Sequence, residues 1–430
     1  MLKKFTALFI IAILAGSLAA CNLKETGTAS TSSAAAEVTA AAEESTAAQQ
    51  SASEASQKSA AKTNSIITTA YTTSNGMIDA GDMFTDRDLT QNADLSDAKY
   101  YTVSDGQNIS ITSAGVYVIS GSASNVTISV DAGDEDKVQI VLDGVSITNT
   151  SNPCIYVKNA DKVFVTTTDS ENTLSVTDNF TADGTTNTDA VIYSKDDLVI
   201  NGQGTLNINS TENGISCKDD LKITGGTIII NCTADGLEAN DSIAIADGSI
   251  TIKTSKDAIH AENDDDNSTG YVYICGGTLD LNAGSDGIQA TTIAQIDGGT
   301  MNITASEGIE ATFVQINGGT INISSSDDGI NGANKSSAYE VTVEINGGDI
   351  TVTMGQGDTD AIDSNGNLYI NGGTLNITAQ SPFDYDGQAN YTGGTMIVNG
   401  TETTTITNQM MGGGMGGMQG GNNMQGFRGR

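Results

Sequence analysis

The chain has 430 residues, with 53 acidic and 18 basic side chains and a formal net charge of −35. This charge excludes nucleic acid as a natural partner, because phosphate binding requires a basic surface. It favours cations, or ligands that reach the protein through cations. The five cysteines show no Cys-x-x-Cys spacing and the chain has one histidine, so zinc or thiol chemistry is not expected and the cysteines of the body should be single buried thiols.

The first twenty residues have the pattern of a signal peptide. Lys3 and Lys4 precede an apolar run that is too short to span a membrane. Leu18 to Cys21 reads Leu-Ala-Ala-Cys and resembles the bacterial lipobox, whose cysteine is lipidated and becomes the mature N-terminus. We expect residues 1–20 to be removed and Cys21 to anchor the protein on the extracellular face of the bacterial cell membrane, through the lipid only. An ordinary secretory signal with an incidental cysteine is the alternative.

Two low-complexity segments flank the body of the chain. Residues 21–65 are mostly Ala, Ser, Thr, Glu and Gln, and such a segment buries too little apolar surface to offset its ordering entropy. We expect a disordered tether there, and a flexible Gly/Met/Gln tail at 406–430. The folded body then comprises residues 66–210, read as an N-terminal cap with the first, less regular turns, and residues 211–405, which form a regular repeat.

The repeat predicts the architecture. One copy runs from Asn213-Gly-Ile through Leu221-Lys-Ile and Gly225-Gly-Thr to Ile230, and later copies follow with a period of about 21–24 residues. Each copy holds three short segments of alternating apolar and polar residues, which is typical of strands with one buried face. A single copy cannot bury that face, so the copies must stack. The sequence predicts an all-β chain, a right-handed parallel β-helix with three short strands in each rung.

Stacking should align acidic residues into a first row. The residue before each corner glycine or alanine is acidic in six rungs: Asp235, Asp257, Asp286, Glu307, Asp328 and Asp360. Two unit charges about 4.8 Å apart repel by about 3.5 kcal/mol at an effective dielectric of 20. Splayed side chains, protonation or a bound cation must relieve this repulsion. Carboxylates suit calcium, which is the predicted cofactor; the alternative is that each aspartate caps its own corner.

A second polar row follows the buried apolar residue of each first strand. It comprises Glu238, His260, Gln289, Glu310, Asn331 and Asp363. The predicted metal ligands are acidic residues of both rows and of an acidic insertion. They are Asp235, Glu238, Asp257, Asp264, Asp266, Asp286, Glu307, Asp328, Asp360 and Asp363.

Two insertions between first and second strands, residues 262–270 and 332–340, leave the helix at the same corner. They are expected to wall a trough, because the two rungs between them carry no insertion, and loops on a rigid scaffold tend to hold binding residues. The predicted carbohydrate contacts on its floor and wall are Gln289, Glu310, Asn331, Lys335 and Tyr339.

Motifs in the less regular part carry a family resemblance. They are Ala114–Tyr117, Val138–Thr148, Cys154–Val157, Ala160–Val163 and Glu171–Leu174, together with the Asp-Gly-Ile and Gly-Gly-Thr rungs. Over about residues 88–400 the chain resembles a clostridial family of surface carbohydrate-binding proteins that have a polysaccharide-lyase-like right-handed β-helix. The resemblance implies binding of cellulose or pectin-like polysaccharide, with calcium in the acidic sites. It does not establish catalysis.

Three functions remain open. A binding module is favoured, and acidic polysaccharide is preferred over cellulose because the chain has no tryptophan and the outward Tyr273 and Tyr369 lie four rungs apart. A lyase needs a base to remove a proton next to a carboxylate. Lys335 is the favoured candidate, and Lys253 or Lys256 are the alternatives. A surface adhesin or spacer without a small ligand is the third reading. We expect a monomeric, non-enzymatic, polysaccharide-binding lipoprotein.

Overall fold

A computed structural model describes residues 77–263, 265–356 and 359–408. Cys21, Asp264, the predicted tether and most of the predicted tail lie outside these residues. The described strands form a 34-stranded sheet in which strands pair in parallel, apart from the antiparallel pair β33–β34. No helix in the described ranges has the length and apolar character to cross a membrane.

The sheet coils so that each strand pairs with its copies in the rungs before and after it, which gives three faces. Face 1 consists of β2 (Ile109–Ile111), β4 (Ile128–Asp131), β6 (Ile155–Asn159), β9 (Ala190–Ser194), β12 (Asn213–Cys217), β15 (Leu237–Ala239), β18 (Ile259–Ala261), the first halves of β21 (Asp286–Ile296) and β23 (Glu307–Ile316), β25 (Ile330–Gly332), β28 (Asp360–Ser364) and β31 (Ser381–Tyr385).

Face 2 consists of β1 (Lys99–Thr102), the first halves of β3 (Gly115–Ser124) and β5 (Lys137–Asn149), β7 (Lys162–Thr167), β10 (Asp197–Gly202), β13 (Asp220–Ile223), β16 (Ser242–Ile245), β19 (Tyr271–Ile274), the second halves of β21 and β23, β26 (Thr342–Ile345), β29 (Asn367–Ile370) and β32 (Ala389–Tyr391). Face 3 consists of the second halves of β3 and β5, β8 (Glu171–Val176), β11 (Thr205–Asn209), β14 (Thr227–Asn231), β17 (Ser249–Lys253), β20 (Thr278–Asn282), β22 (Thr300–Ala305), β24 (Thr320–Ser325), β27 (Asp349–Met354), β30 (Thr374–Thr378) and β33 (Thr395–Val398), followed by β34 (Thr401–Thr403).

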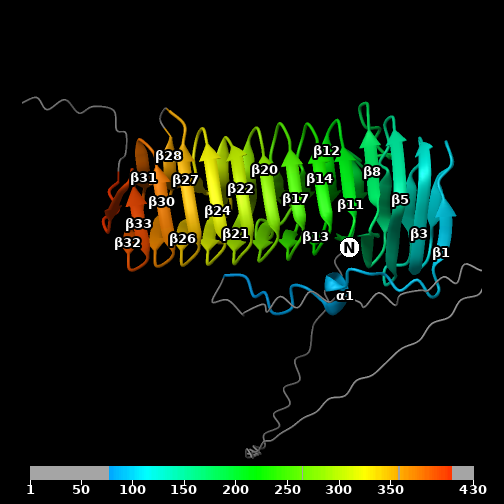
Figure 1. Cartoon of the computed structure of the whole chain (residues 1–430), viewed down its shortest axis with the longest axis horizontal. Helices are drawn as coiled ribbons and strands as arrows, with labels where there is room; N and C mark the ends of the chain where they lie inside the picture. Colours follow the sequence, from blue (N-terminus) through cyan, green and yellow to red (C-terminus); the bar gives the residue numbers. More distant parts are fainter. Residues whose placement is uncertain (1–76, 264, 357–358, 409–430) are drawn as a thin grey trace, which may run out of the picture. The chain divides into compact units, whose positions relative to one another are not determined.

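The coil is a right-handed parallel β-helix, as the repeat predicts. In Figure 1 the rungs advance from right to left, from β1 to β33, and the strands of face 3 run upward at the front. The face 1 strands return behind them, and the face 2 strands cross at the bottom. A path that rises at the front while it advances to the left is right-handed.

Columns of aliphatic side chains fill the interior. Leu237, Ile259 and Ile288 stack in register on face 1 and are fully buried, and the same cluster runs from the first rungs to the last. Glycine permits the corners between faces 2 and 3. Gly299 has a φ of 91°, and a Cβ there would lie 2.9 Å from the carbonyl oxygen of Gly276, so both the backbone conformation and the stacking of rungs require glycine.

The four cysteines of the described chain are free thiols, as expected. Cys154 and Cys217 are buried, and Cys232 and Cys275 are partly buried. Burial raises the pKa of each thiol, because desolvation disfavours the thiolate. They serve as small apolar side chains in and beside the core.

An N-terminal strap, residues 77–98, crosses face 2 against the direction in which the rungs advance. The amide of Ile78 donates to Gln295 Oε1 at 2.7 Å, the Lys222 ammonium donates to the carbonyl of Met83, and the amide of Gly202 donates to Gln91 Oε1 at 2.8 Å. The strap therefore covers outward side chains of this face. Tyr273 points away from the helix interior, as expected, but the strap buries it to 1% exposure, which removes it as a ligand contact.

A short helix, α1 (Asp86–Leu89), secures the strap. Thr85 caps the helix through a reciprocal pair of hydrogen bonds with Asp88. The Asp88 carboxylate is fully buried and lies 3.8 Å from Lys162 Nζ and 3.9 Å from Lys222 Nζ. Arg87 packs on the ring of Phe164 at 4.3 Å. A buried carboxylate between two lysines holds this part of the strap in place.

Replacement of Asp88 by alanine should destabilise the strap by about 3–5 kcal/mol, because it leaves two largely buried ammonium groups without that partner. Hydrogen exchange at the Ile78 amide measures the loss. The exposed Asp86 in the same helical turn gives the control, since Asp86→Ala should cost no more than about 0.5 kcal/mol. Equal protection of Ile78 in both variants would show that the buried carboxylate does not secure the strap.

Candidate functional site

The first acidic row is present on face 1, and three of its aspartates accept a hydrogen bond from a backbone amide of the following rung. The amide of Asp257 donates to Asp235 Oδ1 at 3.2 Å, and the amide of Asp286 donates to Asp257 Oδ1 at 2.8 Å. The same bond joins the amide of Asp360 to Asp328 at 3.1 Å. Asp235, Asp257 and Asp328 thus bind the amide of the next rung, whereas Asp286 accepts from the hydroxyl of the adjacent Ser285. In these three aspartates one oxygen joins successive rungs, and the second can contact other groups.

The second row lies beside the first, and its members are neighbours in register. The order is Glu238, His260, Gln289, Glu310, Asn331, Asp363 and Asp384. The sequence reasoning missed Asp384, because Ser381-Pro-Phe replaces the Asp-Gly-Ile or Asp-Ala-Ile that opens the other rungs. The position of Asp384 after a buried Phe383 was the available signal. The two rows together form a polar surface along face 1.

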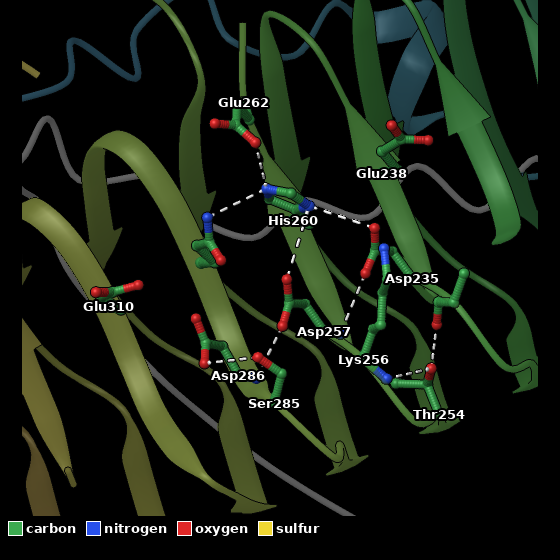
Figure 2. Close-up of polar contacts among 12 residues, drawn as sticks. Asp235, Glu238, Thr254, Lys256, Asp257, His260, Glu262, Ser285, Asp286 and Glu310 are labelled. Atoms are coloured by element: carbon green, nitrogen blue, oxygen red, sulfur yellow. Dashed lines mark hydrogen bonds and ion pairs between the residues drawn. The ribbon is translucent and has the colours of Figure 1, made fainter. Parts of the chain in front are cut away.

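His260 lies among carboxylates of both rows. Its Nδ1 is 3.4 Å from Asp235 Oδ2 and 3.7 Å from Asp257 Oδ2, and its Nε2 is 3.2 Å from Glu262, as Figure 2 shows. Burial alone would lower the pKa of His260, but the hydrogen bond to Asp235 and the three negative charges outweigh burial and raise it. These carboxylates therefore favour the charged form of His260 more than water does, and that form offsets negative charge in this part of the rows.

Lys335 provides a second internal cation. Its Nζ lies 2.5 Å from Glu310 Oε2. Gln289 lies between His260 and Lys335. Its side-chain amide forms hydrogen bonds with both when its oxygen accepts from His260 Nε2 at 3.2 Å and from Lys335 Nζ at 3.3 Å. In that orientation its nitrogen donates to Asp286 at 3.1 Å. Lys335 comes from the second insertion, so a loop residue offsets charge that the rungs create.

Neutralisation is incomplete in the middle of the rows. Asp286, Glu307 and Glu310 bring ligand atoms within 4.8 Å of one another, as do Asp235, Asp257 and His260. Burial, followed by the charges of Asp257, Glu307 and Glu310, raises the pKa of Asp286 to about 8. At neutral pH this cluster must hold a proton or bind a cation.

The excess charge continues toward the last rungs. Burial, together with neighbouring carboxylates, raises the pKa of Asp328 to about 7 and that of Asp363 to about 6. Asn331 is 8% exposed, and its Nδ2 donates to Glu307 at 3.0 Å. Its Oδ1 is buried without a hydrogen-bond partner. A buried carbonyl oxygen beside carboxylates is a donor that fits calcium, which prefers hard oxygen ligands.

The structure does not bring together every residue of the predicted trough. The two insertions meet, since Ser336 Oγ donates to the carbonyl of Asn267 at 2.5 Å, so they do not stand apart as walls. Tyr339 packs against the apolar cluster of face 2 that contains Tyr273, because its loop turns toward that face. Gln289, Glu310, Asn331 and Lys335 do lie together.

Two predicted metal ligands lie apart from the crowded clusters. Glu238 forms an ion pair with Lys218 at 3.2 Å. Asp266 accepts hydrogen bonds from the amide and hydroxyl of Ser268 in the exposed insertion, and these bonds lower its pKa. Both carboxylates thus have partners of their own outside those clusters.

A third carboxylate cluster was not foreseen. Asp197, Asp219 and Asp220 lie within ligand distance of one another at the corner between faces 1 and 2. Burial, followed by the charges of Asp197 and Asp220, raises the pKa of Asp219 to about 7. The adjacent pairs Asp196-Asp197 and Asp219-Asp220, one rung apart, were the signal in the sequence.

The carboxylates with raised pKa values make stability depend on pH. Because the pKa of Asp286 is higher in the folded protein than in the unfolded chain, protonation of this carboxyl group stabilises the fold. This contribution to the free energy of unfolding is complete below the ordinary pKa of 3.8. It is lost as the pH rises toward about 8. In a chelator, we expect thermal unfolding at a lower temperature at pH 8 than at pH 5. Asp286→Asn should reduce that difference, whereas Asp280→Asn, at an exposed outward position of face 3, should leave it unchanged. An identical pH dependence in all three proteins would argue against crowding in the row.

The residues that form the β-helix also match known proteins. A family model described as carbohydrate-binding domain-containing protein matches residues 105–361 and 307–423. A carbohydrate-binding domain-containing protein of Acetivibrio thermocellus is 41% identical over 125 residues, which are 28% of this chain and 43% of that protein. The match thus spans less than half of this relative's length.

Among solved structures, a gadolinium derivative of the polysaccharide lyase-like protein from C. thermocellum is similar to the chain. It is 25% identical with a TM-score of 0.42, over 69% of this chain and 98% of that one. The family model covers most of the β-helix, including both polar rows of face 1. The chain therefore belongs to the family of carbohydrate-binding domain-containing proteins.

Proposed function

We propose that the protein is a cell-surface lipoprotein that binds acidic, pectin-like polysaccharide through calcium ions held on face 1. Membership of a carbohydrate-binding family supports the polysaccharide. The cluster of Asp286, Glu307 and Glu310, with ligand atoms within 4.8 Å, carries the cation part of the proposal. The raised pKa of Asp286 supports this proposal, because a divalent cation would offset the carboxylate charges in place of a proton.

The chain offers a suitable set of oxygen donors for calcium. The carboxylates of Asp286, Glu307 and Glu310 and the buried Oδ1 of Asn331 are the donors that would hold it. Calcium accepts 6 to 8 oxygens in loose geometry, so these residues need not fill its coordination sphere. When bound, it supplies the positive charge that joins protein carboxylates to the carboxylates of a uronic acid.

The setting of Lys335 favours binding over lyase chemistry. A lyase base must be neutral to accept the proton next to the substrate carboxylate. Lys335 Nζ is instead engaged in an ion pair with Glu310 at 2.5 Å, which directs it to a carboxylate of the protein. Among the residues that the structure describes, the one arginine is Arg87. It lies in the strap and packs on Phe164 of face 2, so it does not supply an alternative base on face 1.

Membrane attachment through Cys21 completes the proposal. The lipobox-like residues 18–21 support it. Cys21→Ser should release the protein from the cell envelope into the medium, which fractionation measures. Retention of the variant in the membrane fraction would contradict a lipid anchor at this cysteine.

Affinity measurements with polygalacturonate test the binding mechanism. We expect binding in calcium, its loss in a chelator, and at least a tenfold weaker affinity, or about 1.4 kcal/mol, in the double variant Asp286→Asn/Glu307→Gln. Asp280→Asn serves as the control for the loss of one exposed carboxylate. Binding that ignores the chelator would refute the calcium mechanism. Growth of absorbance from unsaturated products would instead identify a lyase.

Lys335→Met gives the opposite prediction for calcium. Removal of the ammonium frees Glu310 and deletes a competing positive charge, so calorimetry should show roughly tenfold tighter calcium binding, about 1.4 kcal/mol. The Lys253→Met variant removes an exposed lysine on face 3, outside the acidic rows, and should change calcium affinity little. Weaker calcium binding in Lys335→Met would place the cation elsewhere.

A further inference from the structure

We propose a second saccharide site at the N-terminal end of face 1, a pocket that takes one unit of an uncharged sugar without a metal ion. It is separate from the acidic rows and independent of the proposed calcium mechanism. The pocket has a volume of about 520 Å³. It is lined by residues of β4, β6, the turns before β2 and β4, and the loop after β8, among them Asn108, Asn125, Ser129, Tyr156, Lys158 and Asp183. This volume lies in the range typical of small-molecule sites, about 300–1,000 Å³.

A change of side-chain size along one column creates the hollow. The outward residues of successive face 1 strands are Ser110, Ser129, Tyr156 and Tyr193, in register. Two small side chains are thus followed by two large ones, and Tyr156 packs edge-on against Tyr193 at a ring separation of 5.7 Å. The tyrosines form a step, and the serines leave space in front of it.

The rim of the pocket is held in shape by hydrogen bonds within the protein. In the loop between β8 and β9, Asp183 and Thr186 pair through their backbones, and Thr188 Oγ1 donates to the carbonyl of Thr181 at 3.0 Å. On the opposite side, the buried Asn149 donates to the carbonyl of Asn152 at 3.1 Å. A rim held in this way loses little conformational entropy when a ligand enters.

The charges that line the pocket cancel. Lys158 Nζ lies 2.8 Å from Asp183 Oδ2, and the Tyr156 hydroxyl donates to the same oxygen at 3.2 Å. These contacts lower the pKa of Asp183 and raise that of Lys158, so both side chains are ionised as a pair. In a chain with a net charge of −35, a neutral pocket favours a ligand without a carboxylate. The Lys158 ammonium also covers the Tyr156 ring at 4.7 Å, so polar contacts must dominate recognition.

The pocket offers hydrogen-bond donors beside an acceptor. Asn108 Oδ1 accepts from the amide of Thr127 at 2.9 Å, and Asn125 Oδ1 accepts from the amide of Thr150 at 3.0 Å. Because their oxygens are used, both asparagines present NH₂ groups as donors. Asp183 retains acceptor capacity on its carboxylate. Donors and an acceptor around a compact neutral cavity match the neighbouring hydroxyl groups of a sugar ring.

Calorimetry in a chelator with neutral hexasaccharides tests this site, using cello-, manno- and xylohexaose as probes for the full chain. We expect at least one of them to bind. Ser129→Leu fills the cavity and should weaken that binding at least tenfold. Ser146→Leu makes the same substitution at an outward position of face 3 and should leave the affinity unchanged. Asn108→Ala, at an exposed rim position, should also weaken binding. This variant tests the site even if Ser129→Leu does not fold.

Three results would overturn the proposal. They are the absence of binding by all three probes, unchanged affinity in both pocket variants, and an equal loss of affinity in Asp286→Asn/Glu307→Gln. The proposed calcium mechanism can fail separately, because it is tested with polygalacturonate in calcium and this pocket is tested with neutral sugars in a chelator.

Discussion

Parallel hydrogen bonding between successive rungs is the constraint on which the rest of the structure depends. It holds each strand about 4.8 Å from its copy, so a residue type that recurs in the repeat becomes a column. Inside the coil this places Leu237, Ile259 and Ile288 in contact. Outside, the same stacking places Asp286 beside Glu307. One backbone geometry therefore produces both the apolar core and the electrostatic strain of face 1.

The protein relieves this strain in three different ways. Backbone amides of the next rung bind one oxygen of several aspartates. His260 and Lys335 supply positive charge within the rows, and Gln289 links them. The remaining charge around Asp286 is met by protons or by a cation. Because repulsion is already present in the folded protein, a bound cation removes an existing unfavourable interaction as well as forming new bonds.

Face 1 also shows how one scaffold presents two chemically different surfaces. Its outward column changes from serine and tyrosine at the first rungs to carboxylates and amides further along. The backbone is nearly the same in both regions, so side-chain size and charge alone distinguish a neutral pocket from an acidic row. Much of face 2 is covered by the strap, which leaves face 1 to carry the charged rows.

The sequence by itself determined the features that repeat. Its period and alternation predicted the β-helix, and the positions of Asp257, Asp286 and Glu307 predicted a crowded row, because identical offsets in successive rungs must become neighbours. Only the tertiary structure decided the contacts that do not repeat. The strap reaches Gln315 from Met77, a separation of 238 residues, the two insertions meet through Ser336 and Asn267, and Tyr339 turns to face 2. Such contacts depend on the path of single loops and segments, for which no periodic signal exists in the chain.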